Sequence, residues 1–454
     1  MRRQRSRSKL PTEPVSLDIT KLSHEGRGLA HHEGRVVFVD GALPGETVLA
    51  RLTSRRGSYL EAATETVLTA APERVEPPCP HFSQCGGCSL QHMDSAAQLH
   101  FKDAGLHERL AHETGQGDYQ QLPVLSGAVT GYRRKARLAV RYVPKRQRVL
   151  VGFRERHSNF ITDMQSCLVL DSRVATLLPE LSALIMTLRA RESLPQVEVA
   201  LGDPGTGEHG ALVFRHLQPL AATDAERLTA FGVEHQLSIY LQPKGPDSVH
   251  KLQPRTGLER LTYALPAWGL QLAFHPLDFT QVNAGINRLM LEQALHLLDP
   301  QPHERVLDLF CGLGNFTLAL ATRAASVLGV EGVDAMVQRG RENAARNGLH
   351  NADFVCADLS QPPATHPWLR EGFDKVLLDP PRSGAEEVLP AVIAAHPARI
   401  VYVSCNPATL ARDAGILQAQ GYRLAAAGAM DMFPHTSHVE AMALFLPVRK
   451  REQP

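Results

Sequence analysis

The sequence predicts a multidomain protein: an N-terminal small β-barrel, an α+β central domain and a C-terminal α/β domain with a Rossmann-like sheet. Near the N-terminus, short β-branched runs alternate with glycine-containing turns, which is typical of a small barrel. From about Pro276 onward, strand-like and helix-like segments alternate. A chain of 454 residues is also long for a single core. The expected divisions are a basic tail at 1–14, the barrel at 15–74, the central domain at 75–275 and the α/β domain at 276–454.

The periodicity of apolar residues predicts helices at roughly Ser95–His112, with a serine cap, and around Ser172–Arg191. In the C-terminal part, buried-strand patterns alternate with amphipathic ones, so we expect a doubly wound parallel sheet covered by helices on both faces. The expected strands are "RVLDLF", "SVLGVEGV", "ADFVCADL", "FDKVLLDPP" and "RIVYVSC".

Composition indicates a globular protein, with 43% hydrophobic and 21% charged residues and a formal net charge of +1. No window approaches the roughly 18 apolar residues of a membrane span, and "MRRQRSRSKLP" lacks the apolar core of a signal peptide. These observations predict a cytoplasmic protein.

One stretch departs from this neutral balance. Residues Arg133 to Arg156 include ten Lys or Arg and one acid. Such runs are usually solvated faces, but Tyr132, Tyr142 and Phe153 are interleaved with this one. Positive charge with aromatic side chains suits a phosphate-bearing partner, which predicts contact with RNA or DNA.

A glycine loop predicts a cofactor site. In "VLDLFCGLGNF", a strand leads into Gly312 and Gly314, which open a helix. Glycines permit a tight turn and close approach to a ligand at the carboxyl end of a strand. Glu331 ends the next strand, where a carboxylate can accept both ribose hydroxyls, and the missing third glycine argues against NAD.

Further acids close the neighbouring strands. Asp358 ends "VCADL" and Asp379 follows in "LLDPPRSG", so four acidic strand ends, with Asp308 and Glu331, surround the loop. A pyrophosphate would be repelled there, whereas a cationic sulfonium is tolerated. The pattern favours S-adenosylmethionine over a plain structural sheet.

The strand "RIVYVSC" ends in Cys405, followed by Asn406 and Pro407. A lone cysteine is often a buried small hydrophobe. At the carboxyl end of a strand beside the cofactor, however, a thiol is a candidate nucleophile.

Four segments together identify a family resemblance. "DLFCGLGNFTLALA", "LLDPPRSGA", "VSCNPATLARD" and "HVEAMALF" resemble the class I methyltransferase domain of RNA uracil-C5 methyltransferases. "LSHEGRGLAHHEGRVVFVDGALPGETV" resembles a TRAM domain, an RNA-binding barrel. The resemblance is closest to bacterial members that carry both a TRAM domain and an iron–sulfur cluster.

The resemblance implies S-adenosylmethionine-dependent methylation of carbon 5 of a uridine in 23S rRNA, U1939. Another rRNA uridine or tRNA is the alternative. It also implies a partner, 23S rRNA free or in pre-ribosomal particles, and a monomeric enzyme that flips the target uridine out of its stack. A radical enzyme with a C-x3-C-x2-C cluster and a non-catalytic RNA-binding protein are less consistent with these motifs.

The family's functional residues carry over to matching positions. Cys405 would be the nucleophile that adds to uracil C6, and Glu440 the general base that removes the C5 proton; His435 and His438 are rival bases nearby. Asp379 and Arg382 are candidates for orienting the uracil. Because thiol reactivity needs a lowered pKa, we expect an electropositive or hydrogen-bonding environment at Cys405. The cofactor contacts implied are Gln281, Phe310, Asn315, Glu331, Asp358 and Asp379.

A cysteine cluster predicts a metal site. "CPHFSQCGGC" gives a C-x5-C-x2-C spacing, with Cys167 as the distant fourth ligand. Zinc and a cubane cluster both accept four thiolates, so spacing leaves both open; the resemblance implies [4Fe-4S] with an architectural role. Cys311 and Cys356 are expected to be core thiols. The predicted ligands are Cys79, Cys85, Cys88 and Cys167.

Overall fold

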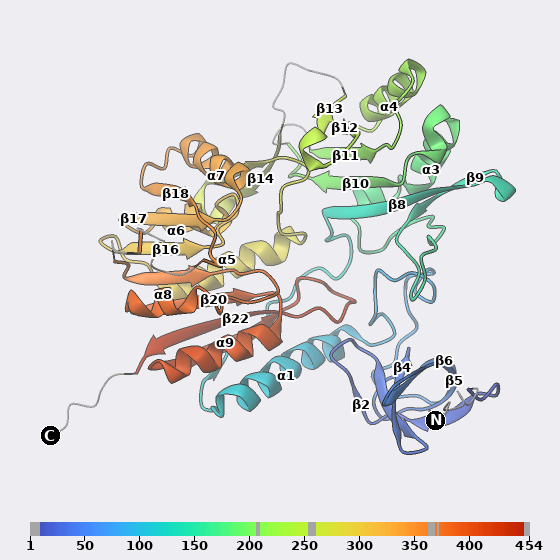
Figure 1. Ribbon diagram of the computed structural model, residues 1–454, viewed down its shortest axis with the longest axis horizontal. Coiled ribbons are helices and arrows are strands. Elements are labelled where there is room, and N and C mark those ends of the chain that lie inside the picture. Colours follow the sequence, from blue (N-terminus) through green and yellow to red (C-terminus); the bar gives the residue numbers. More distant parts are fainter. Residues whose placement is uncertain (1–9, 206–208, 253–259, 362–367, 370–371, 449–454) are drawn as a thin grey trace, which may run out of the picture. The chain divides into compact units, whose positions relative to one another are not determined.

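The computed structural model describes residues 10–205, 209–252, 260–361, 368–369 and 372–448 (Figure 1). Residues 1–9, most of the predicted basic tail, lie outside this range. The chain forms two compact units, Met1–Lys102 with Phe433–His438, and Asp103–Met432 with Val439–Pro454. Within the described residues, every helix is too short or too polar to cross a membrane.

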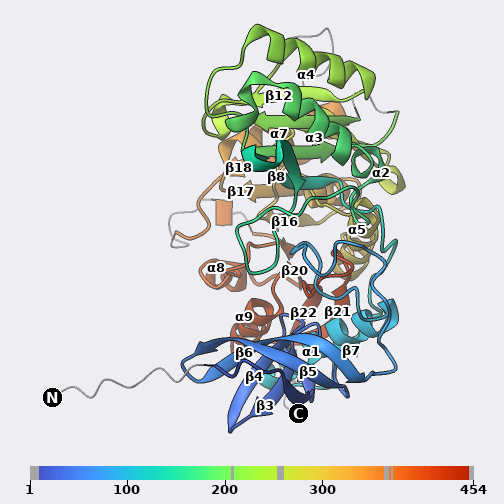
Figure 2. The ribbon, with the colours of Figure 1, turned by 90° about the vertical axis from the view of Figure 1, so that its right-hand side faces the viewer.

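The first unit contains the predicted small β-fold, a six-stranded sheet in the order β1-β5-β6-β4-β3-β2 (Figure 2). Its strands alternate buried apolar and exposed residues: Val37 and Val39 of β4 are fully buried, as are Val48 and Ala50 of β5. This alternation gives the sheet an apolar core. The strands are β1 (Val15–Asp18), β2 (Lys21–Leu22), β3 (Gly28–His32), β4 (Arg35–Asp40), β5 (Thr47–Arg56) and β6 (Tyr59–Thr69).

Helix α1 (Ser95–Thr114) confirms the first predicted helix and begins in this unit. Its first turn is held by Asp94, whose Oδ1 accepts hydrogen bonds from the N–H groups of Ala96 (2.9 Å) and Ala97 (3.0 Å). The predicted serine cap is therefore displaced by one residue, since a carboxylate satisfies the free amides of a helix start equally well.

The second unit begins with a six-stranded sheet in the order β13-β12-β11-β10-β8-β9. Helices α3 and α4 contact this sheet at β9 and β12. The elements are β8 (Lys135–Val143), β9 (Arg148–Gly152), α2 (Ser172–Ala175), α3 (Leu178–Thr187), β10 (Gln196–Leu201), β11 (Gly210–Arg215), α4 (Ala222–Glu234), β12 (Ser238–Gln242) and β13 (His250–Lys251), with a hairpin of β14 (Leu261–Leu265) and β15 (Leu270–Phe274) following.

The prediction of one helix over Ser172–Arg191 is wrong in detail. The segment forms α2, α3 and a short 3-10 helix at Arg189–Glu192. Pro179 lies in the first turn of α3, where its missing N–H costs nothing, and it cannot continue a preceding helix.

The C-terminal part of the second unit is the predicted Rossmann-like domain. Its eight-stranded sheet has the order β18-β17-β16-β19-β20-β22-β21-β7. The first five strands run parallel, whereas β22 runs antiparallel to both β20 and β21. Its elements are β7 (Gln120–Gln121), α5 (Ala284–Leu298), β16 (Arg305–Leu309), α6 (Asn315–Ala321), β17 (Ser326–Glu331), α7 (Asp334–Arg346), β18 (Ala352–Cys356), β19 (Lys375–Leu378), α8 (Leu389–Ala394), β20 (Arg399–Ser404), α9 (Pro407–Ala419), β21 (Tyr422–Met430) and β22 (Glu440–Pro447).

Helices cover this sheet, as predicted for a doubly wound fold (Figure 1). One continuous apolar core joins strand residues such as Leu307, Leu378 and Tyr402 to Leu389 of α8 and Leu417 of α9. Helices α5, α6 and α7 also contact the sheet strands. Burial of the central strands on both sides explains their almost unbroken apolar sequence.

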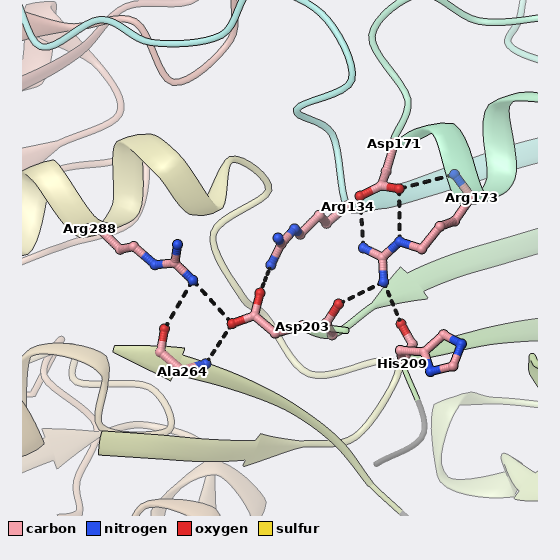
Figure 3. A network of polar contacts seen from close by, with 8 residues as sticks. Arg134, Asp171, Arg173, Asp203, His209, Ala264 and Arg288 are labelled. Atoms are coloured by element: carbon pink, nitrogen blue, oxygen red, sulfur yellow. Dashed lines mark hydrogen bonds and ion pairs between the residues drawn. The ribbon is translucent and has the colours of Figure 1, made fainter. Parts of the chain in front are cut away.

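A polar junction links the two sheets of the second unit (Figure 3). Asp203, just after β10, forms ion pairs with Arg134 and with Arg288 of α5, the latter at 3.1 Å. The same carboxylate accepts a hydrogen bond from the N–H of Ala264 in β14 at 2.8 Å. Burial of Asp203 would raise its pKa, but these hydrogen bonds and the two arginines lower it overall. One side chain therefore ties four segments together.

We expect Asp203→Ala to destabilise the second unit by about 3 kcal/mol, because Arg134 and Arg288 would lose a shared, largely buried counterion. The measurement is the shift of the urea or thermal midpoint of the full chain. As a matched control, Asp163→Ala removes the partner of Arg148 from an exposed pair and should cost less than about 1 kcal/mol. Equal midpoint shifts for both variants would contradict this role for the junction.

Candidate functional site

The predicted site residues gather at one edge of the eight-stranded sheet. Strands β16, β17, β19 and β20 are parallel and in register, with Leu309 paired to both Val330 and Leu378. Their carboxyl ends therefore meet at one edge. The residues that lie at these ends are Phe310 after β16, Glu331 at the end of β17, Asp379 after β19 and Cys405 after β20.

Glu440 reaches the same edge because β22 is antiparallel to β20. Ser404 pairs with Ala441, so the first residue of β22 lies beside the residue that follows β20. Glu440 is buried, and its charge acts on the Cys405 thiol. The structure thus brings together two side chains that are 35 positions apart in the sequence.

The glycine loop has the expected backbone. Gly312 and Gly314 have φ values of 56° and 96°, and Phe310, before them, has a φ of 64°, which is strained for a residue with a side chain. Glu331 accepts hydrogen bonds from the N–H groups of Gly312 (3.1 Å) and Val333 (3.0 Å). Its carboxylate is thereby fixed next to the loop.

Asn315, the first residue of α6, is held by two residues that the sequence analysis did not single out. Asn315 Nδ2 donates to Asn287 Oδ1 at 2.8 Å, and Asn315 Oδ1 accepts from Asn287 Nδ2 at 3.2 Å. The hydroxyl of Tyr263 donates to the same oxygen at 2.9 Å. No sequence motif signalled this amide pair, because its members lie on separate elements.

The two remaining predicted contacts, Gln281 and Asp358, do not lie directly at the end of a strand. Gln281 is half-buried in the segment between β15 and α5, where the carbonyl of the next residue, Val282, accepts from Arg134 N at 2.9 Å. Asp358 is exposed, two residues beyond the end of β18 rather than at its end as predicted. Its Oδ1 accepts from Ser360 N at 3.0 Å and Ser360 Oγ at 2.7 Å.

The turn that carries Cys405 is well defined. Asn406 caps α9 by accepting from Ala408 N at 3.1 Å, and its own amide donates to the carbonyl of Arg382 at 3.1 Å. Pro407 occupies the first turn of the helix, where proline is favoured. The Asn-Pro pair therefore ends the strand, starts the helix and places the half-buried thiol at the edge.

The electrostatic prediction for Cys405 is wrong. Burial first, and then the nearby carboxylates of Glu440 and Asp379, raise the pKa of the Cys405 thiol to about 11, against a smaller lowering by Arg382 and by a backbone hydrogen bond. Sequence patterns do not show how strongly one arginine and two acids on other strands act on the thiol, because these effects depend on burial and distance. The thiol of the free protein is therefore protonated at neutral pH.

Three carboxyl groups of this edge also bind protons unusually tightly. Burial and, to a smaller extent, Asp379 raise the pKa of Glu440 to about 8, against a lowering by Arg382, and burial raises the pKa of Asp379 itself to about 7. Asp308 is fully buried in β16 with a pKa raised to about 8 by burial, although Thr317 Oγ1 donates to it at 2.5 Å. A site with this many acids suits a cationic ligand and opposes an anionic one.

The rival bases lie in the other compact unit. Nδ1 of His435 is 3.4 Å from Gln98 Nε2, and the ring of His438 packs edge-on against Phe433 with 5.7 Å between centroids. Both rings thus have contacts within their own unit.

The predicted metal ligands are also divided: Cys79, Cys85 and Cys88 belong to the first unit and Cys167 to the second. In the described part of the chain, no three His, Cys, Asp or Glu side chains form a group that could hold a metal ion. One feature does fit a cluster ligand, because Gly87 N donates to Cys85 Sγ at 3.3 Å, as amides do to cluster thiolates.

Of the two predicted core thiols, Cys311 is buried, but Cys356 is exposed because β18 is the edge strand.

The aromatic side chains of the basic stretch are less available than predicted. Tyr132 is buried, and the guanidinium of Arg191 lies over the ring of Tyr142 at 5.2 Å. The guanidinium of Arg133 lies 5.8 Å from the ring centroid of Phe153. The stretch keeps its positive charge, but these rings do not form an open stacking surface.

Comparison with known proteins agrees with this architecture. A family model described as tRNA (uracil-5-)-methyltransferase matches residues 108–362 and 369–448, and a TRAM domain model matches residues 13–63. The chain is 57% identical over 442 residues to the 23S rRNA (uracil(1939)-C(5))-methyltransferase RlmD of Alkalilimnicola ehrlichii, covering 97% of this chain and 98% of that protein. It is 55% identical over 446 residues to the protein of the same name from Hahella chejuensis, covering 97% and 99%.

A solved structure has a similar fold. The tRNA (uracil-54, C5)-methyltransferase of Pyrococcus abyssi, in complex with S-adenosyl-L-homocysteine, matches with a TM-score of 0.72 and 24% identity. The match covers 95% of this chain and 100% of that chain.

The reactivity of Cys405 tests the electrostatics of the edge. Because the Glu440 carboxylate raises the pKa of the thiol, Glu440→Gln should lower that pKa and speed alkylation of Cys405 by iodoacetamide at pH 8.5 several-fold. Arg382→Gln should slow it, since the arginine lowers the pKa. Peptide mass spectrometry distinguishes Cys405 from the exposed Cys356, whose rate serves as the internal control. Equal rates in the wild type and both variants would contradict the assigned charges.

Proposed function

Because the chain belongs to the tRNA (uracil-5-)-methyltransferase family, we propose that it transfers a methyl group from S-adenosylmethionine to carbon 5 of U1939 in 23S rRNA. The observation that carries the proposal is the meeting of Cys405 and Glu440 at the acidic edge of the sheet. The choice of 23S rRNA is supported by the names of relatives that are 57% and 55% identical along almost the whole chain.

S-adenosylmethionine, when bound, supplies an electrophilic methyl group on a positively charged sulfur. Residues of the edge are suited to hold it: Glu331 for the ribose hydroxyls, Asp358 for the adenine amino group and Asp379 near the cationic end. Gly312 and Gly314 let the backbone approach the ligand closely. Gln281, Phe310 and Asn315 complete the proposed cofactor-binding residues.

Cys405 makes the uracil reactive. Carbon 5 is a poor nucleophile, but addition of the thiolate to carbon 6 turns the ring into an enolate whose carbon 5 can attack the methyl group. The bond between the methyl group and the sulfur would break in this step, and the sulfur would leave as a neutral thioether. The thiol must first lose its proton, and its raised pKa means that substrate binding has to supply the driving force. A bound cation beside Glu440 and Asp379 would offset their charge and lower the pKa of the thiol.

Glu440 then removes the proton from carbon 5, after which the thiolate is eliminated and the aromatic uracil is restored. Only the ionised carboxylate can accept this proton. With a pKa near 8 in the free protein, Glu440 is close to the value that serves a base at physiological pH. Asp379 and Arg382, which act on both groups electrostatically, would orient the uracil edge.

We also propose that Cys79, Cys85, Cys88 and Cys167 bind a [4Fe-4S] cluster with an architectural role. The C-x5-C-x2-C spacing and the amide bond to Cys85 Sγ support it. Methylation of carbon 5 involves no electron transfer, so the cluster would stabilise the chain rather than react.

The remaining assignments follow from this function. The TRAM barrel at 15–74 and the central domain at 75–275 would bind RNA, the residues at 276–454 would perform methyl transfer, and the tail at 1–14 would add positive charge. The enzyme would act as a monomer in the cytoplasm, on 23S rRNA either free or in pre-ribosomal particles.

A direct test uses the purified full chain with 23S rRNA and radiolabelled S-adenosylmethionine. We expect one methyl group at carbon 5 of U1939, located by nuclease mapping. Cys405→Ala should abolish transfer, a loss of at least about a thousandfold, while its affinity for S-adenosylmethionine stays unchanged. Methylation of another rRNA uridine or of tRNA would refute the proposed substrate, and turnover by Cys405→Ala would refute the nucleophile.

The cluster is tested by anaerobic purification followed by iron and acid-labile sulfide analysis. We expect about four of each per chain, with broad visible absorbance that disappears in Cys85→Ser. Cys356→Ser, which changes an exposed thiol outside the proposed set, is the control and should retain full iron content. Bound zinc without visible absorbance would rule out the cluster and favour a zinc site.

A further inference from the structure

The segment that follows β9 forms a hairpin with a defined tip. Thr162 N donates to the carbonyl of Phe153 at 2.9 Å, and Glu155 N donates to the carbonyl of Phe160 at 3.0 Å. Between these bonds, Arg154 and Ile161 form an antiparallel bridge. The hairpin therefore holds its side chains in fixed directions.

The tip is braced by side chains as well. Phe160 N donates to Ser158 Oγ at 3.0 Å, while Ser158 Oγ donates to Glu155 at 3.0 Å. Arg154 Nη1 donates to Asn159 Oδ1 at 2.9 Å. An ordered tip can present a side chain to a partner at little entropic cost.

Phe160 is 67% exposed, although it is a large apolar residue on this braced hairpin. Because side chains alternate along paired strands, Phe160 and Phe153 lie on the same face, in diagonal positions. The guanidinium of Arg133 lies over the ring of Phe153. Arg133 and Phe153 thus form a pair of flat groups, and Phe160, in a diagonal position on the same face, is open to solvent.

Arg133 is joined to the segment that contains Gln281, one of the proposed cofactor-binding residues. Arg133 forms an antiparallel bridge with Asn283, two residues after Gln281 in the sequence. The adjacent Arg134 N donates to the carbonyl of Val282 at 2.9 Å. All these residues belong to the second compact unit, and Arg133, beside Phe153, is thereby tied to the proposed cofactor-binding segment.

Building on the proposed function, we propose that Phe160 is a stacking platform for an unpaired base of the RNA that flanks the target uridine. Aromatic side chains and guanidinium planes are the usual partners of unstacked RNA bases. The surrounding stretch Arg133–Arg156, with ten basic residues and one acid, complements the negatively charged RNA backbone and disfavours a positively charged partner. Phe160 lies four residues beyond that stretch, outside the basic pattern by which the sequence indicates RNA contact.

The test compares RNA binding by the full-length wild type, Phe160→Ala and Phe160→Trp, using a 23S rRNA fragment that contains U1939. Loss of one stacked base should weaken binding by Phe160→Ala about five- to a hundredfold, and tryptophan should preserve wild-type affinity. Leu217→Ala is the matched control: Leu217 is 63% exposed, lies in the same unit and should have no effect. The affinity for S-adenosylmethionine and the melting temperature should be the same in all four proteins.

A second readout reports stacking itself. With 2-aminopurine placed in turn at each position flanking U1939, one position should be quenched by the wild type and Phe160→Trp but not by Phe160→Ala. Unchanged affinity of Phe160→Ala, or quenching at no position, would overturn the proposal and leave Phe160 available for contact with a protein. If the wild type itself neither binds nor methylates the fragment, the proposed function fails instead.

Discussion

The antiparallel pairing of β22 with β20 is the constraint on which the candidate site depends. Five parallel strands bring their carboxyl ends to one edge, but a sixth parallel strand would have delivered the start of "EAMALFLP" to the opposite edge. Reversal of β22 instead places its first residue beside the end of β20, with Ser404 opposite Ala441. A register slip of one residue would turn the Glu440 side chain to the other face of the sheet. The proximity of the proposed nucleophile and the proposed base is therefore a property of sheet topology rather than of any local motif.

Three carboxyl groups with raised pKa values lie in the same part of the sheet. Asp308, Asp379 and Glu440 have pKa values raised to between about 7 and 8, each mainly by burial, so the free site holds protons that carboxyl groups ordinarily release. A bound cation favours the ionised forms of such groups, whereas the free protein favours the neutral ones. Binding of a sulfonium and release of protons are thus coupled. In the empty site the burial of these acids is energetically unfavourable. In the occupied site their ionised forms complement the positive charge of the ligand.

Much of the architecture could be predicted from the sequence because it follows from local patterns. Alternation of apolar runs with amphipathic segments specified the sheet, and the Asn-Pro pair after Cys405 specified a turn at a strand end. What could not be predicted depends on segments far apart in the chain. The raised pKa of Cys405 arises from burial and from acids on other strands, and the covering of Tyr142 arises from Arg191 on a later segment. The exposure of Cys356 follows from the position of β18 at the end of the sheet, which strand periodicity does not reveal.

The protonated state of the Cys405 thiol lowers its susceptibility to oxidation. Peroxides attack thiolates far faster than thiols, and the first oxidation product of a catalytic cysteine already abolishes its nucleophilicity. With the pKa of Cys405 near 11, only a very small fraction of the free protein carries the vulnerable form at neutral pH. The carboxylates that keep the Cys405 thiol protonated therefore also shield it from oxidants in the free protein. For the proposed nucleophile, this means little oxidative loss during the intervals between substrates.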